Sequence, residues 1–211
     1  MSSLLTRFLF TTKTKIGSDM VRLKHKSPWL AEGDAKKITV MVARARQMLS
    51  STIAALNCGT VKSEFARTYF TAVPTAGEWQ RIQAKLELIY GGLNTDVTLK
   101  LGADSSEAPG RVGFVKQTGR WVGPGEIEWS YEGRTIHVSK KYMLRNEEGG
   151  VRTIIHEASH KYANTEDHDW RGYREADDSR WMDPGLTKAE ALNNADSYAW
   201  FVYQQGASMG A

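Results

Sequence analysis

The stretch His156-Glu157-Ala158-Ser159-His160 decides both the fold and the candidate site of this chain. In an α-helix, residues four positions apart lie one turn above each other, so both histidines can project toward the same ion. Two imidazoles at this spacing, with a glutamate after the first, are the pattern of a zinc site with an adjacent general base. The alternative interpretation is a pair of surface histidines flanking an acidic residue on an ordinary helix.

The sequence around this stretch favours a helix from about Asn146 to Ala163. An apolar stripe recurs at three- and four-residue steps and predicts a core-facing side roughly opposite the histidines. Asn146 is a suitable first residue, and Asn164 can adopt the left-handed conformation that ends a helix. The stripe consists of Val151, Ile154, Ile155 and Ala158.

The residue types also suit one chemistry. Neutral imidazole is a good ligand for Zn²⁺, and a catalytic zinc site keeps one position open for water. Bound zinc lowers the pKa of that water to about 7, and the neighbouring Glu157 carboxylate can take its proton as the water attacks an amide carbonyl. The sequence therefore predicts Zn²⁺ as the cofactor and the hydrolysis of peptide bonds as the reaction.

A catalytic zinc site needs a third protein ligand, which physical reasoning alone leaves open. The polar stretch 164–169 follows the helix directly, and a glutamate farther along the chain is another possibility. The candidates are Glu166, Asp167, His168, Asp169 and the more distant Glu190.

Three motifs in order resemble those of the aspzincins, the deuterolysin and peptidyl-Lys metalloendopeptidase family. They are His156-Glu157-Ala158-Ser159-His160, then Thr165-x-Asp167-x-x-Trp170, then Asn193-Asn194-Ala195-Asp196, and the match spans roughly residues 150–203. The resemblance implies a zincin-like fold, zinc ligands His156, His160 and Asp167, and Glu157 as the general base of an endopeptidase.

The chain also departs from the family pattern after the second histidine. Asn164 stands in place of a glycine, which an asparagine can replace in a left-handed conformation. Trp170 stands where the family has a tyrosine that steadies the oxyanion, and Arg171 replaces a final glycine. We assign the catalytic role of that tyrosine to Tyr173 and assign Trp170 to substrate binding. Because the gap after His160 is short, Asp169 is a fallback for the third ligand.

A last helix is predicted from Thr187 to Gln205, and Asp196 lies within it on a largely apolar stripe with Leu192 and Trp200. A carboxylate in such surroundings must be paired, hydrogen-bonded or functional. Lysine-specific family members use this acid, with a second one three residues later, to hold the substrate lysine. The second position here is Ala199, so we assign Asp196 to substrate binding without strict lysine specificity. The alternative is that Asp196 orients a zinc-ligating histidine.

Composition and charge set the domain boundaries. The 211 residues are enough for one domain with an extension, and no apolar run approaches the roughly 20 residues of a membrane span. Residues 1–30 hold six of the chain's basic residues against Asp19, while the net charge of the whole chain is +4. We therefore predict a basic N-terminal extension at 1–30 and a zincin-like metallopeptidase domain at 31–211. Cys58 is the single cysteine, which excludes an intramolecular disulfide.

The coarse pattern predicts the α+β class. Helices are expected at about 34–56 and 75–90, before the helix that carries the histidines. Between them, β-forming stretches at 96–101, 112–115, 126–130 and 135–139 predict a small antiparallel sheet, with the last two strands as hairpin partners. His137 lies in the last strand, either as an ordinary strand residue or beside an edge where a peptide pairs.

These observations favour a zinc-dependent endopeptidase that acts on proteins or peptides. Two other functions stay open: a zinc amidase that acts on cell-wall peptides, and a non-enzymatic binding module that uses the basic N-terminal segment. We expect neither nucleic acid as a partner nor a membrane span. The absence of disulfides and of a recognisable signal peptide suggests a bacterial effector or toxin that folds in the cytoplasm, leaves by a non-classical route and has an inhibitor or immunity protein.

Overall fold

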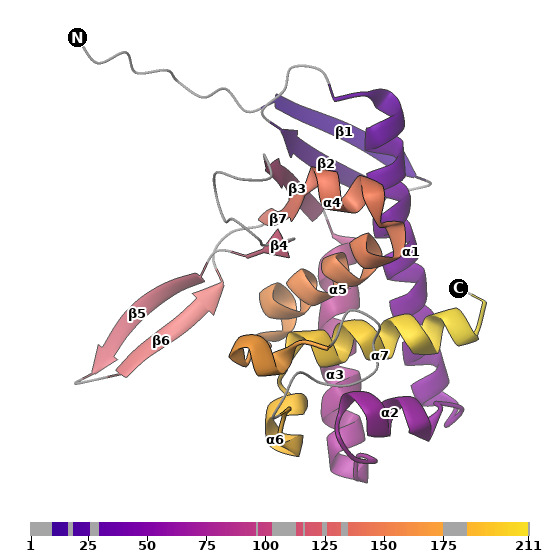
Figure 1. Ribbon diagram of the computed structural model, residues 1–211, viewed down its shortest axis with the longest axis vertical. Coiled ribbons are helices and arrows are strands. Elements are labelled where there is room, and N and C mark those ends of the chain that lie inside the picture. Colours follow the sequence, from indigo (N-terminus) through magenta and orange to yellow (C-terminus); the bar gives the residue numbers. More distant parts are fainter. Residues whose placement is uncertain are drawn as a thin grey trace.

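The computed structural model describes residues 10–16, 19–25, 30–95, 97–102, 113–115, 117–123, 126–131, 135–174 and 185–210. Figure 1 shows the arrangement of the elements. The strands are β1 (Phe10–Ile16), β2 (Asp19–His25), β3 (Val97–Gly102), β4 (Gly113–Phe114), β5 (Gln117–Gly123), β6 (Glu126–Tyr131) and β7 (Thr135–Ser139). The helices are α1 (Glu32–Asn57), α2 (Ser63–Tyr69), α3 (Ala76–Asn94), α4 (Lys140–Arg145), α5 (Glu147–Ala163), the 3-10 helix η1 (Asp169–Gly172), α6 (Lys188–Ala191) and α7 (Ala195–Ser208). The chain is of the α+β class, as predicted.

The main sheet is mixed, and the prediction of a purely antiparallel sheet was wrong. Its strand order is β1-β2-β3-β7-β4. The two central pairings, β2 with β3 and β3 with β7, are parallel, whereas the outer pairings are antiparallel. The expected hairpin between 126–130 and 135–139 is also absent from the described pairings, because β6 pairs with β5 instead. The β5–β6 ribbon projects away from the rest of the molecule in Figure 1.

The prediction that residues 1–30 lie outside the folded domain was wrong for β1 and β2. Both strands belong to the main sheet, where β2 pairs with β3. Val21 and Leu23 are 1% and 0% exposed, while the intervening Arg22 is partly exposed. This segment therefore alternates between core and surface like any half-buried strand. Its basic residues occupy alternate positions and had obscured that pattern.

The helices form the core beneath the sheet. Helices α1, α3 and α5 pack against one another, and α7 packs against α1 and α5. The helix predicted at about 34–56 is α1, and its apolar residues Ile38, Val42 and Leu49 are all 0% exposed. Helix α3 begins at the capping box in which Thr75 and Glu78 satisfy each other's backbone N–H groups. None of the described helices is long and apolar enough to cross a membrane.

The predicted last helix is split into α6 and α7. The break lies at residues 192–194, where the chain forms a parallel bridge between Asn194 and Glu166. The N–H of Glu166 donates to the carbonyl of Asn193, and the N–H of Ala195 donates to the carbonyl of Glu166. These bonds attach the segment after α5 to the start of α7, so Asp196 lies in the first turn of a new helix. Leu192 and Asp196 therefore do not share one continuous helix.

Candidate metal centre

Helix α5 brings the two histidines together. Their Nε2 atoms are 3.1 Å apart, and the two residues are 8% and 5% exposed. The predicted stripe on the same helix is fully buried, with Val151, Ile154 and Ile155 at 0%. Because the stripe fixes the rotation of the helix in the core, the backbone already holds both imidazoles in position. Asn146 caps this helix by accepting a hydrogen bond from the N–H of Gly149.

The turn after α5 delivers the third group. Asn164 has the left-handed conformation, with φ 49° and ψ 46°, as the sequence predicted. The chain then folds back, and Thr165 is fixed by a hydrogen bond from its N–H to the Ser159 carbonyl and by a 2.7 Å contact between the two hydroxyls. As a result, Oδ1 of Asp167 lies 3.3 Å from Nε2 of His156 and 3.3 Å from Nε2 of His160.

The three atoms form a triangle that fits a tetrahedral zinc site. Zinc bonds to imidazole nitrogen and carboxylate oxygen are about 2.0–2.2 Å long, so two tetrahedral ligand atoms lie roughly 3.3 Å apart. The observed sides are 3.1, 3.3 and 3.3 Å. Within the described ranges, His156, His160 and Asp167 are the one group of three metal-ligating side chains that converges in this way. Asp167 is thus the candidate third ligand.

The electrostatics of the triangle also favour a cation at its centre. Burial acts to raise the pKa of Asp167, but hydrogen bonding and positive charge from His156 and His160 hold that pKa well below its usual range. Burial acts to lower the pKa of His156, but Asp167 and Asp196 raise it well above its ordinary value. A divalent cation would supply the positive charge that these carboxylates stabilise.

The alternative ligands are placed elsewhere. Asp169 begins the helix η1 with a positive φ of 49° and is not part of the converging group. Glu190 accepts hydrogen bonds from Arg171 and from the N–H of Thr187, so it closes a capping box and joins η1 to α6. The distant glutamate considered from the sequence is therefore a structural residue.

Each histidine is oriented through its second ring nitrogen. Nδ1 of His160 lies 2.8 Å from the carbonyl oxygen of Thr165. Nδ1 of His156 lies 3.4 Å from Oδ1 of Asp196, whose Oδ2 accepts a hydrogen bond from the N–H of Arg174 at 3.3 Å. Partners of this kind fix the tautomer and direction of a metal-ligating imidazole. The geometry around Asp196 is that of a supporting carboxylate, the alternative role that the sequence had left open.

Glu157 belongs to α5, and its side chain is buried against strand β4. It is 4% exposed, and β4 passes so close that a Cβ added at Gly113 would lie 2.7 Å from Oε1 of Glu157 and 2.8 Å from a methyl group of Thr153. A glycine is needed there because any side chain would displace the carboxylate. The base candidate therefore lies directly beneath β4, the outermost of the described strands on this side of the sheet.

Tyr173 reaches the centre, whereas Trp170 lies at its border. The Tyr173 ring stacks on His156, with centroids 6.0 Å apart and planes 16° from parallel, and its hydroxyl hydrogen-bonds to Asp167. Burial and nearby carboxylates raise the pKa of this phenol above its ordinary value, so its hydroxyl keeps its proton. Trp170 is 58% exposed, and no described contact joins its side chain to the three ligand candidates. A protein substrate can still reach this exposed ring.

Asn194 is a supporting residue to which the sequence gave no role. Its side-chain amide donates to the carbonyl of Gly172 at 2.8 Å and to the hydroxyl of Ser197 at 3.2 Å. A Cβ added at Gly172 would lie 2.7 Å from Oδ1 of Asn194, so only glycine permits this approach. Asn194 thereby holds the segment that presents Tyr173. Its position two residues before Asp196, at a helix start, was the available signal.

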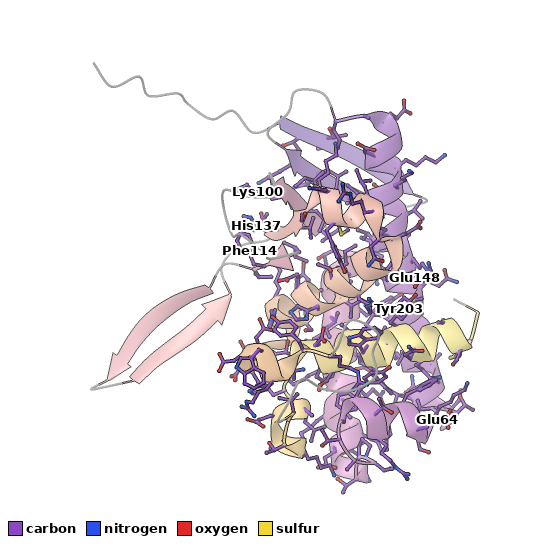
Figure 2. The ribbon with its side chains drawn as sticks, viewed as in Figure 1. Glu64, Lys100, Phe114, His137, Glu148 and Tyr203 are labelled. Atoms are coloured by element: carbon purple, nitrogen blue, oxygen red, sulfur yellow. The ribbon has the colours of Figure 1, made fainter. Side chains whose placement is uncertain are left out.

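Of the three other histidines, His137 and His168 are not part of the converging group. His137 is on β7, which has β3 and β4 on either side, so it does not line the sheet edge. Its ring stacks on Phe114 at 4.3 Å, and Figure 2 shows both beside Lys100 on neighbouring strands. The outer strand on this side, among the strands that the structure describes, is β4. His25 is the last residue of β2, and its side chain is not among those described.

Comparison with known proteins supports the fold. No protein-family model matches the chain, and no curated protein matches it. Among solved structures, the chain is similar to the zinc peptidase from Grifola frondosa, with a TM-score of 0.61 over 83% of this chain and 97% of that chain. The two sequences are 13% identical, so the likeness concerns the fold. The chain therefore has the fold of a zinc peptidase, and its His156–His160–Asp167 group could hold a metal ion.

Proposed function

We propose that the protein is a zinc-dependent endopeptidase of the aspzincin type that hydrolyses peptide bonds in proteins. The observation that carries the proposal is the triangle of Nε2, Nε2 and Oδ1 atoms with 3.1–3.3 Å sides, next to a buried glutamate. The likeness to a solved zinc peptidase supports the same conclusion from the fold. In this proposal His156, His160 and Asp167 hold the zinc.

In this proposal the side chains around the zinc transfer the proton, stabilise the developing charge and orient the ligands. Zinc, when bound, makes a water molecule acidic near neutral pH and polarises a carbonyl oxygen. Glu157 accepts the proton of the attacking water and passes it to the leaving amine. Tyr173 donates a hydrogen bond from its protonated hydroxyl to the oxygen on which negative charge develops. Asp196 and the carbonyl of Thr165 keep the two imidazoles in place throughout.

The edge strand suggests how a polypeptide lies in this site. Among the described strands, β4 ends the main sheet, and its inner neighbour is β7. An extended peptide can add to such an edge through main-chain hydrogen bonds, which gives affinity independent of sequence. We infer that the substrate backbone runs along β4, above Glu157, and that the exposed ring of Trp170 contacts it at the border of the site. Because such pairing requires an extended backbone, we expect the peptidase to cleave unfolded segments of proteins.

Zinc content and substrate choice test the proposal together. The purified protein should bind about one zinc per chain and should degrade unfolded casein, a chelator such as 1,10-phenanthroline should stop the degradation, and added zinc should restore it. If the protein cleaves cell-wall peptides but leaves casein uncleaved, the result would indicate the amidase instead. A protein without stoichiometric zinc whose affinity for a polyanion falls steeply with salt would indicate a binding module.

We further propose that the peptidase is an exported bacterial effector with a dedicated inhibitor or immunity protein. The proposal is based on the single cysteine of the sequence, because a fold that needs no intramolecular disulfide can form in a reducing compartment before export. Expression of the wild-type protein inside a susceptible cell should then slow growth, while the Glu157→Gln protein at equal abundance should not. Equal growth with both proteins would contradict the effector role and leave the peptidase proposal intact.

A further inference from the structure

A row of paired side chains continues from the metal centre along the line where α5 and α7 pack. The two helices run antiparallel there, and each pair lies about one helical turn beyond the last. The pairs are His156 with Asp196, Arg152 with Trp200, and Glu148 with Tyr203. Figure 2 labels Glu148 and Tyr203, which lie close together where α5 meets α7. Arg152 is therefore the cation on α5 that lies one turn from a ligand candidate, on the same face of the helix.

Arg152 is held by its flat face. The guanidinium carbon lies 3.8 Å from the centroid of the Trp200 ring and 5.1 Å from that of Tyr203. Such stacking uses the face of the guanidinium and leaves its N–H groups, which point outward in the plane, available for a carboxylate. Arg152 is partly exposed, whereas Trp200 is only 9% exposed. The aromatic ring thus acts as a fixed platform for a cation that solvent can reach.

The nearby carboxylates are engaged with other groups. Burial, and then a hydrogen bond from the Tyr203 hydroxyl to Glu148, raise the pKa of that phenol. Asp196 contacts His156 and accepts the N–H of Arg174. Within the described part of the chain, no carboxylate forms an ion pair with Arg152. Among the described residues, the positive charge of Arg152 is thus stabilised by aromatic rings, and no carboxylate of this set is paired with it.

A second arginine reinforces the positive character of this region. Tyr69 stacks on Trp200 with planes 7° from parallel, and the guanidinium carbon of Arg174 lies 5.2 Å from the Tyr69 ring centroid. Ala199 is 0% exposed and occupies the position at which a second acid would be needed to hold a substrate lysine. On the side of the centre next to His156, Arg152 is therefore the partly exposed cation, and the buried Arg174 adds positive charge behind the aromatic rings.

We propose that Arg152 selects substrates that carry a carboxylate close to the scissile peptide bond. The inference rests on the proposed peptidase function and names its substrate class. An aspartate or glutamate side chain of the substrate forms a bidentate ion pair with the in-plane N–H groups of Arg152, while Trp200 holds the guanidinium from behind. A free C-terminal carboxylate offers the same chemistry, so the experiment separates these two sources.

The test compares matched peptides with the zinc-loaded protein. Internally quenched peptides differ only in Glu or the isosteric Gln beside the cleaved bond, and each is made with a free or an amidated C-terminus. We expect kcat/KM to favour Glu on the order of tenfold, as for a charge-assisted hydrogen-bonded pair. Arg152→Gln should reduce the Glu-to-Gln ratio to near one, and Arg152→Lys should leave an intermediate ratio because its charge remains without the planar fork.

Controls separate recognition from damage. A merely structural loss in the Arg152→Gln protein would lower kcat/KM for both peptides alike and leave their ratio unchanged, which would overturn the proposal. Arg145→Gln, an equal charge change at an exposed residue of α4, should preserve the ratio. A wild-type preference for Lys or Arg, or for no charge, would also overturn it. A preference seen only with the free C-terminus would assign the carboxylate to the chain end.

Binding measurements keep the proposal testable even if no peptide is cleaved. The Glu157→Gln protein should bind the Glu peptide more tightly than the Gln peptide in fluorescence anisotropy. Adding Arg152→Gln should remove that difference. Equal affinities in the presence of Arg152 would refute carboxylate selection, whereas a clear difference without any cleavage by the wild-type protein would refute only the peptidase function.

Discussion

Oδ1 of Asp196 lies 3.4 Å from Nδ1 of His156, on the side of the imidazole away from Asp167. The second oxygen of the same carboxylate accepts the N–H of Arg174. Both oxygens thus have partners within the protein, and the carboxylate contacts a ligand candidate. Removing a carboxylate that holds a metal-ligating histidine should slow the cleavage of every substrate equally. Removing a carboxylate that binds a substrate lysine should slow the cleavage of lysine-containing substrates only. This difference can be measured.

We predict that Asp196→Asn lowers zinc affinity and lowers activity on all peptides by a similar factor. Loss of such a supporting partner typically costs roughly 10–100-fold in metal affinity or activity. Zinc affinity is measured by competition with a fluorescent chelator, and cleavage sites are mapped in a denatured protein mixture. An Asp196→Asn protein with unchanged zinc affinity and a changed cleavage pattern would show that the acid contacts the substrate after all.

The third ligand is tested with two matched substitutions. Asp167→Asn should lower zinc affinity by more than the roughly 10–100-fold typical of a supporting residue. Asp169→Asn should change it little, because asparagine tolerates the positive φ of that position. His156→Ala and His160→Ala should remove zinc from the purified protein, as measured by elemental analysis. Stronger loss with Asp169→Asn than with Asp167→Asn would move the ligand role to Asp169.

Glu157→Gln should keep the fold and the zinc but lose activity by at least the roughly 10²–10⁴-fold that a general base contributes. The amide has nearly the shape of the carboxylate and so still fits beneath Gly113, but it cannot accept the proton of the attacking water. Circular dichroism and zinc content serve as controls on the same sample. Turnover close to that of the wild-type protein would exclude Glu157 as the base.

Local sequence patterns predicted helix α5 well. The spacing of His156 and His160, the apolar stripe and the left-handed Asn164 are all properties of one helix and its end, and periodicity reports such properties directly. Asp167 required the additional resemblance to a known motif. Three nearby acids compete for that role in the sequence, and only the folded turn shows which one reaches both imidazoles.

Long-range pairing explains what the sequence did not predict. The direction of β2 and β3 depends on strands separated by about 70 residues, which alternation within one strand cannot reveal. The break before α7 arises from a backbone bridge to Glu166. The helical pattern of residues 187–205 is continuous, so it does not indicate this break. The placement of Tyr173 likewise depends on Asn194 and Gly172, which meet only after folding.

Tyr173→Phe should lower kcat with little effect on KM. The ring stacking on His156 is retained, but the hydroxyl that donates a hydrogen bond to the developing negative charge is lost, at a cost on the order of 10²–10³ in kcat. Trp170→Ala provides the contrast, because an exposed substrate-contacting ring should affect mainly KM. Steady-state kinetics on one peptide separate the two parameters. A rise in KM alone for Tyr173→Phe would assign Tyr173 to substrate binding.

Acid should weaken the contact between η1 and α6 through Glu190. Hydrogen bonds from Arg171 and Thr187 lower the pKa of Glu190 from 4.5 to about 2. Because the folded-state pKa lies below the unfolded value, the carboxylate contributes stability above about pH 4.5, and that contribution is lost as the pH falls toward 2. Glu190→Gln should therefore lower the melting temperature at pH 6 but have a progressively smaller effect between pH 4.5 and 2.5. Glu64→Gln, the same charge change in the first turn of α2, serves as the control. A deficit in the Glu190→Gln protein that stays constant across this range would show that the hydrogen bonds around Glu190 matter and its charge does not.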